Sequence, residues 1–82
     1  MFDNHGITPA MAEEAFTDVM RVVIEPDYAS ASGRSVRTIG YSQTYGAILS
    51  IITVIHDGTV HGANGWRSNS RDTRIYRGGD DG

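Results

Sequence analysis

The run from Ala47 to His56, Ala-Ile-Leu-Ser-Ile-Ile-Thr-Val-Ile-His, constrains the fold more than any other stretch of the chain. It is the most apolar segment of the sequence, and β-branched residues dominate it. Such residues are stiff at χ1 and favour a pleated strand. A strand that is apolar on both faces is typical of the centre of a sheet. We therefore expect a central strand with neighbours at its edges and other elements over its faces.

The flanking segments predict two antiparallel neighbours for this strand. Residues 35–42 alternate as a strand does, which places Arg37 and Gly40 on opposite faces. Asp57-Gly58 is a strong signal for a tight hairpin turn, and residues 60–66 then return alongside the central run. Residues 34–66 are thus expected to form a three-stranded meander.

Two helices and a short strand complete the expected fold. Thr8 is a good N-cap and Pro9 suits a first helical position, so a helix is predicted over residues 9–18. Residues 21–25 form a short strand candidate, and a short helix is predicted over residues 71–77. The fold class is therefore α+β, an antiparallel sheet meander with one N-terminal helix packed on a face and a short C-terminal helix. Residues 1–7 are expected to be irregular.

Length and composition favour one small domain. We expect a single domain over residues 1–77 and a flexible acidic tail over residues 78–82. The absence of cysteine excludes disulfides and thiolate metal sites. No apolar run approaches the roughly 18–20 residues of a membrane span, and no signal peptide is visible. A cytoplasmic protein with no membrane contact, metal or cofactor is the expectation.

Charge is divided along the chain. Residues 1–33 hold six acidic residues and one arginine, whereas residues 34–77 hold six arginines and two acidic residues. Every basic residue is arginine, the side chain best suited to bidentate contact with phosphate. A GC-rich genome, whose codons favour arginine, is one explanation. The other is a basic region that binds nucleic acid.

The arginine-rich half supplies the candidate chemistry, which is ribonucleolysis. Arginines would hold the scissile phosphate and stabilise its added negative charge, a base would deprotonate a ribose 2′-OH, and aromatic rings would stack on bases. The candidate catalytic residues are His61, Arg67 and Asp72. The candidate residues for binding RNA phosphate and bases are Arg34, Arg37, Trp66, Arg71, Arg74 and Tyr76. The competing interpretation is that the arginines of residues 71–77 form the solvated face of a helix.

Short motifs in a fixed order give a family resemblance over residues 5–77. They are His5-Gly6-Ile7, Glu13-Glu14-Ala15-Phe16-Thr17-Asp18, Pro26-Asp27, Arg37-Thr38-Ile39-Gly40-Tyr41-Ser42 and Arg71-Asp72-Thr73-Arg74-Ile75-Tyr76. In these motifs the chain resembles the BrnT-type toxins of bacterial type II toxin–antitoxin pairs, within the RelE-like superfamily. Gly62-Ala63-Asn64-Gly65-Trp66 and Asn69 are similar to an actinobacterial branch of that family.

The resemblance implies a RelE-like fold and cleavage of mRNA without a metal ion. It also implies neutralisation by a cognate DNA-binding antitoxin of the ribbon-helix-helix or a similar type. Family members usually begin with a strand and a full helix before His-Gly, so we expect this sheet to lack an edge strand. Trp66 stands where many members have a catalytic arginine, with Arg67 adjacent.

These departures keep a second function open. An exposed sheet edge invites pairing with another chain. The alternative is therefore a non-catalytic, toxin-like interaction protein, either a degenerate toxin or an inhibitor, that binds a protein partner through that edge. A homodimer built through the same edge is a further expectation.

Overall fold

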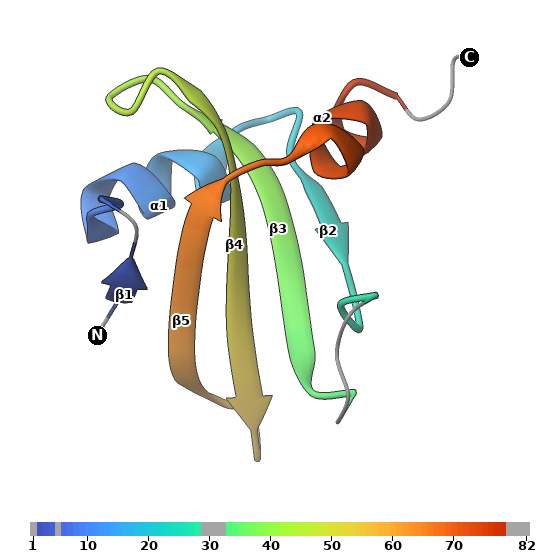
Figure 1. Cartoon of the computed structure of the whole chain (residues 1–82). Coiled ribbons are helices and arrows are strands. Elements are labelled where there is room, and N and C mark those ends of the chain that lie inside the picture. The colour runs from blue at the N-terminus through green and yellow to red at the C-terminus, as the bar shows by residue number, and fades with distance from the viewer. Residues whose placement is uncertain (1, 5, 29–32, 79–82) are drawn as a thin grey trace.

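The computed structural model describes residues 2–4, 6–28 and 33–78. It confirms the α+β class: one five-stranded sheet carries two helices (Figure 1). The elements in chain order are β1 (Phe2–Asn4), α1 (Pro9–Thr17), β2 (Val22–Ile24), β3 (Ser35–Ser42), β4 (Ala47–His56), β5 (Thr59–Arg67) and α2 (Ser70–Tyr76). The strand order across the sheet is β1-β5-β4-β3-β2, so β4 is central as predicted.

The predicted meander is confirmed. Strands β3 and β4 pair antiparallel from Ser42 opposite Ala47 to Ser35 opposite Val54. Strand β5 returns antiparallel along β4, with a bulge near Val54. The hairpin between them turns at Asp57 and Gly58, which have φ of 56° and 77°. Both angles are left-handed, as the Asp-Gly signal requires.

The beginning of the chain corrects one prediction. Residues 2–4, expected to be irregular, form β1, which pairs parallel to β5 with Phe2 opposite Ala63 and Asn4 opposite Gly65. The sheet was expected to lack an edge strand, but β1 covers the outer edge of β5 over three residues. A three-residue strand is too short to show a periodic pattern, and it forms here because the polar backbone edge of β5 is available for pairing.

Helix α1 packs over β3 and β4. The Oγ1 of Thr8 accepts a hydrogen bond from the backbone N of Met11 at 3.2 Å, which confirms the predicted N-cap. The buried side chains where this helix meets the sheet are Ile7, Ala12, Ala15, Leu49 and Ile51. Gly40 permits the close approach, because a Cβ at that position would lie 2.3 Å from the carbonyl oxygen of Ala15.

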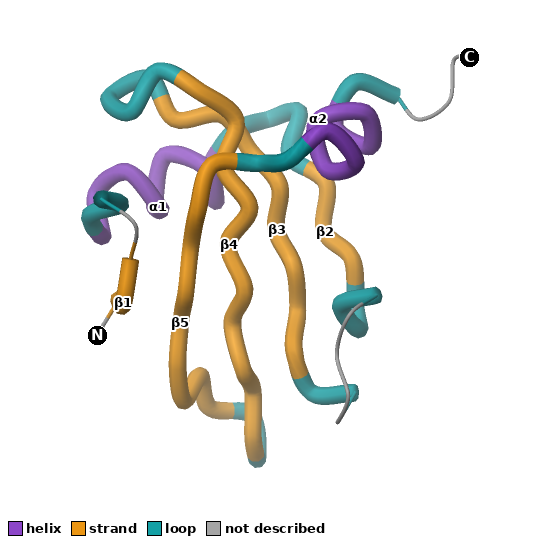
Figure 2. Tube along the Cα trace, viewed as in Figure 1, coloured by secondary structure: helices purple, strands orange, loops and turns teal. Residues whose placement is uncertain are grey.

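Both helices lie near the end of the sheet where β4 begins and β5 ends (Figures 1 and 2). Strand pairing places Arg37, Ile39 and Tyr41 on the face opposite to the one that faces α1. Helix α2 contacts β3. Neither described helix is long and apolar enough to span a membrane. Of the tail predicted for residues 78–82, all but Gly78 falls outside the described residues.

Candidate functional site

A buried ionic cluster joins three separate parts of the chain. The Nε of Arg37 in β3 donates to Asp27 Oδ1 at 2.6 Å, and its Nη1 donates to Asp72 Oδ2 at 2.5 Å. The three residues are only 6%, 5% and 0% exposed for Asp27, Arg37 and Asp72. The loop after β2, the middle of the sheet and helix α2 are thereby tied together.

Asp72 is the most heavily bonded residue of this cluster. Besides the contact with Arg37, it accepts hydrogen bonds from the Tyr28 hydroxyl at 2.5 Å and the Ser50 hydroxyl at 2.6 Å. Burial alone would raise the pKa of Asp72, but the hydrogen bonds from Ser50, Tyr28 and Arg37 outweigh it and lower the pKa. The carboxylate is therefore ionised and surrounded by donors of the protein itself.

Aromatic rings flank the same arginine. The Arg37 guanidinium lies 4.3 Å from the centroid of the Tyr28 ring and 5.7 Å from that of Trp66. The Arg71 guanidinium lies 5.2 Å from the Tyr28 ring. These are cation–π distances, so Trp66, predicted to stack on a base, has a protein cation against its ring.

The cluster changes the interpretation of two predicted site residues. Arg37 was expected to bind phosphate and Asp72 to serve as a general base. In the structure each neutralises the other in the interior, and a carboxylate that is 0% exposed does not reach a ribose 2′-OH. Their buried positions argue for a structural role. Arg37 shares its face of β3 with the apolar Ile39, and this alternation was the available sequence signal that it faces the interior.

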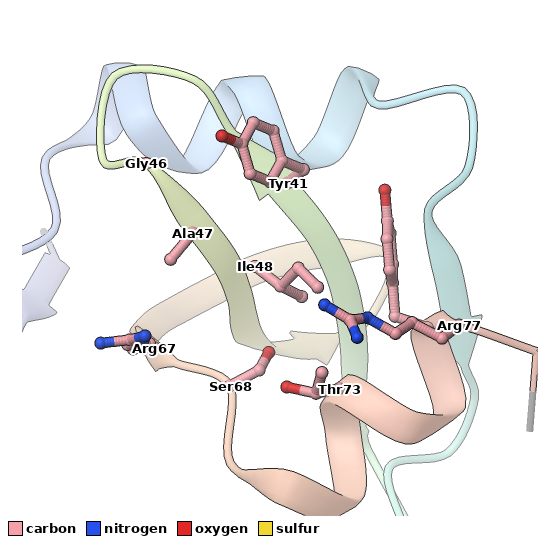
Figure 3. Close-up of a pocket in the computed structure, with 9 residues that line it drawn as sticks. Tyr41, Gly46, Ala47, Ile48, Arg67, Ser68, Thr73 and Arg77 are labelled. Atoms are coloured by element: carbon pink, nitrogen blue, oxygen red, sulfur yellow. The ribbon is translucent and has the colours of Figure 1, made fainter.

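A separate groove of about 460 Å³ lies between the end of the sheet and α2 (Figure 3). It is lined by Tyr41, Gly46, Ala47, Ile48, Arg67, Ser68, Thr73, Tyr76 and Arg77. Arg77 extends across the hollow towards Ile48, whereas Arg67 lies at the opposite rim (Figure 3). Within the described part of the chain, no carboxylate forms an ion pair with either guanidinium.

Asp18 at the end of α1 fixes one wall of this groove. Its Oδ2 accepts hydrogen bonds from the Tyr76 hydroxyl at 2.5 Å and from the backbone N of Tyr41 at 2.8 Å. The hydrogen bond to Asp18, with burial, raises the pKa of Tyr76 to about 12. Tyr76 is therefore protonated at neutral pH and directs its proton to Asp18, so it contributes a ring to the groove rather than a base.

The other predicted site residues lie away from the groove. Arg34 precedes β3, and its carbonyl accepts from Ile55 N at the far end of the sheet. Arg71 and Arg74 are exposed on α2 but do not line the groove. His61 belongs to β5, and its side chain lies outside the described part of the structure. It precedes Arg67 by six strand positions, a separation of about 20 Å along the backbone.

The groove thus brings together two of the predicted site residues, Arg67 and Tyr76, with others that were not assigned to the site, among them Tyr41 and Arg77. The alternation of β3 already placed Tyr41 on the same face as Arg37. Arg77 was recognisable as basic but was not distinguished from Arg71 and Arg74 of α2. These side chains come together only because α2 packs over the strand ends.

Among the described residues, no group of three His, Asp or Glu side chains is arranged to hold a metal ion. Comparisons of the chain with protein-family models, with curated proteins and with solved structures found no match. The groove and the residues around it are therefore the basis for assigning a function.

Proposed function

We propose that this protein is an endoribonuclease that cleaves single-stranded RNA in the groove beside α2 without a metal ion, as the toxin of a bacterial type II toxin–antitoxin pair. The observation that carries the proposal is the make-up of the groove. Arg67 and Arg77 line it with no carboxylate partner in the described chain, next to the ring of Tyr41, which is 42% exposed.

The groove suits a nucleotide better than a purely apolar ligand. Two guanidinium groups at separate points of the groove match successive phosphates or the two sides of one phosphate. The Tyr41 ring offers a stacking surface, which is how single-stranded RNA is usually held. The hydroxyls of Ser68 and Thr73 add donors for a ribose or phosphate oxygen. Together these groups favour a short stretch of RNA.

In the proposed reaction, the ribose 2′-oxygen attacks the adjacent phosphorus and the bond from phosphorus to the 5′-oxygen breaks. The products are a 2′,3′-cyclic phosphate and a free 5′-hydroxyl. The proton of the 2′-OH passes to solvent, and the Tyr41 phenol donates a proton to the leaving 5′-oxygen. Arg67 and Arg77 stabilise the additional negative charge of the five-coordinate phosphorus. Tyr76 shapes the wall through its bond to Asp18.

The test is cleavage of end-labelled single-stranded RNA by the purified protein. We expect 2′,3′-cyclic ends, and no cleavage at a 2′-deoxy position. Arg67→Ala and Arg77→Ala should each lower kcat/KM by roughly a hundredfold, the scale for losing one group that stabilises transition-state charge. Tyr41→Phe should retain RNA binding and lose turnover, whereas Tyr41→Ala should lose both.

Arg34→Ala is the matched control, because it removes an arginine at the far end of the sheet. It should cleave at the wild-type rate. Equal losses for Arg34→Ala and Arg67→Ala would show that bulk positive charge, and not the groove, acts on RNA. In cells, expression should arrest growth and degrade mRNA, and a co-expressed DNA-binding antitoxin should restore growth.

A specific observation keeps the non-catalytic alternative in view. Of the three residues predicted to be catalytic, Asp72 is buried and the His61 backbone is distant from the groove, which leaves Arg67. A toxin-like binding protein would hold RNA or a protein partner without cleaving it. Salt-dependent RNA binding that requires Arg67 and Arg77, with the RNA recovered intact, would establish this alternative in place of the nuclease.

A further inference from the structure

Strand β2 is an edge of the sheet, and within residues 2–4, 6–28 and 33–78 no strand pairs with its outer side. Large apolar side chains on this strand and just before it are unusually exposed. Val19 is 88% exposed, Met20 65% and Val23 51%. We propose that β2 is a self-association surface, on which a second copy of this chain pairs its own β2 antiparallel about a two-fold axis at Val23.

The sequence of this edge is complementary to itself when it is reversed. It reads Arg21-Val22-Val23-Ile24-Glu25. Antiparallel pairing centred on Val23 places Arg21 opposite the partner's Glu25 and Val22 opposite the partner's Ile24. By symmetry each of these pairs occurs twice. Cross-strand pairs of opposite charge and of β-branched residues are the ones that stabilise antiparallel strands.

The register is specific. Moving the two-fold axis by half a residue towards Glu25 would place Arg21 opposite the partner's Pro26, which has no backbone N–H and carries no charge. Only the axis at Val23 brings both charges of one strand against opposite charges of the other. An isologous contact of this kind closes as a dimer.

The faces of the sheet are compatible with this pairing. Val23 pairs with Thr38 and therefore lies on the α1 side of the sheet. Directly opposed residues of paired strands share a face, so the two Val23 side chains would meet on that side. Val19 and Met20 lie in the turn that leads from α1 into β2, beside the same edge. Pairing would cover apolar surface that is otherwise in water.

Natural edge strands usually discourage such contacts with like charges, proline or bulges. Here Pro26 limits the edge to a short segment, but the charges at the two ends are opposite rather than alike. The pairing segment is small, so we expect an association at the weak end of specific interfaces. None of its residues lines the α2 groove, so the inference is independent of the proposed nuclease activity.

Charge exchange tests the register directly. Sedimentation equilibrium of the full chain should show the 8.9 kDa monomer at low concentration and twice that mass at high concentration. Arg21→Glu places two glutamates opposite each other in each cross-strand pair, and Glu25→Arg places two arginines opposite each other. Each variant alone should dimerise about tenfold or more weakly. An equimolar mixture of the two should form a heterodimer, and the double variant should regain the wild-type association.

The mixture controls for misfolding, since two misfolded chains would not restore each other. This matters because Arg21 Nη1 also donates to the Asp18 carbonyl within its own chain. Arg34→Glu reverses the charge of an arginine that is not on β2, and this variant should dimerise as the wild type does. A wild-type protein that stays monomeric at millimolar concentration would overturn the proposal. So would a mixture or double variant that fails to associate.

Discussion

Asp72 offers the sharpest test of how this protein is held together. We predict that Asp72→Asn destabilises the fold, because the carboxylate is 0% exposed and receives hydrogen bonds from Arg37, Tyr28 and Ser50. The carboxamide keeps the volume but loses the charge. It also turns an NH₂ donor towards groups that are themselves donors.

The magnitude follows from the local geometry. Removing one member of a buried ion pair costs about 3–5 kcal/mol. Asp27 still holds the Nε of Arg37 at 2.6 Å after the change, so Arg37 keeps one counter-charge. We therefore expect the lower end, about 3 kcal/mol. A domain of this length has a total stability of about 4–12 kcal/mol, so the loss is a large part of it.

The assay is urea unfolding followed by fluorescence of Trp66, which lies 5.7 Å from the Arg37 guanidinium and is the only tryptophan. Asp57→Asn is the matched control, since that side chain is 87% exposed and asparagine tolerates its left-handed φ of 56°. It should change stability by less than about 0.5 kcal/mol. If Asp72→Asn unfolds no more easily than Asp57→Asn, the structural role assigned to Asp72 is wrong.

Four further changes test the packing and the pH dependence. Gly40→Ala should destabilise by about 1–3 kcal/mol in thermal unfolding, because its Cβ meets the Ala15 backbone. Gly65→Ala should cost less, because its closest contact, at 2.8 Å, is the end of a flexible side chain. The folded-state pKa of Tyr76 is raised to about 12, so its contribution to the unfolding free energy is complete below about pH 10 and is lost as the pH rises towards 12. Tyr76→Phe should remove this loss of stability at alkaline pH. Hydrogen bonds lower the folded-state pKa of Glu14, so its contribution to the unfolding free energy is complete above about pH 4.3 and is lost as the pH falls further. Glu14→Gln should reduce this loss of stability at acid pH.

Sequence alone was sufficient for the elements whose signals are local. The β-branched run of β4, the Asp-Gly turn and the Thr8-Pro9 start of α1 all lie where the sequence placed them. Strand β1 was missed because its three residues carry no pattern of their own. Its pairing depends on the exposed edge of β5, which exists only once the meander has formed.

The site was harder to predict, because its geometry depends on contacts between distant positions. Arg37 and Asp72 are 35 positions apart, and the sequence shows separate charges where the fold makes a buried ion pair. The same charges therefore looked available for RNA. Arg67 and Arg77 show no such pairing in the described chain, but nothing in their local sequence separates them from Arg34 or Arg74.

The buried cluster and the groove are coupled through α2. A seven-residue helix is not stable by itself in water, so its position depends on the contacts of Asp72 in the interior and of Tyr76 with Asp18. Tyr76 and Arg77 reach the groove only from that position. A variant of Asp72 would thus lose RNA cleavage by displacing α2, even though the carboxylate never touches RNA. Lost activity identifies a catalytic carboxylate only where the unfolding free energy is unchanged, whereas Arg67→Ala should lose activity with the fold intact, because Arg67 lies on β5 and is exposed.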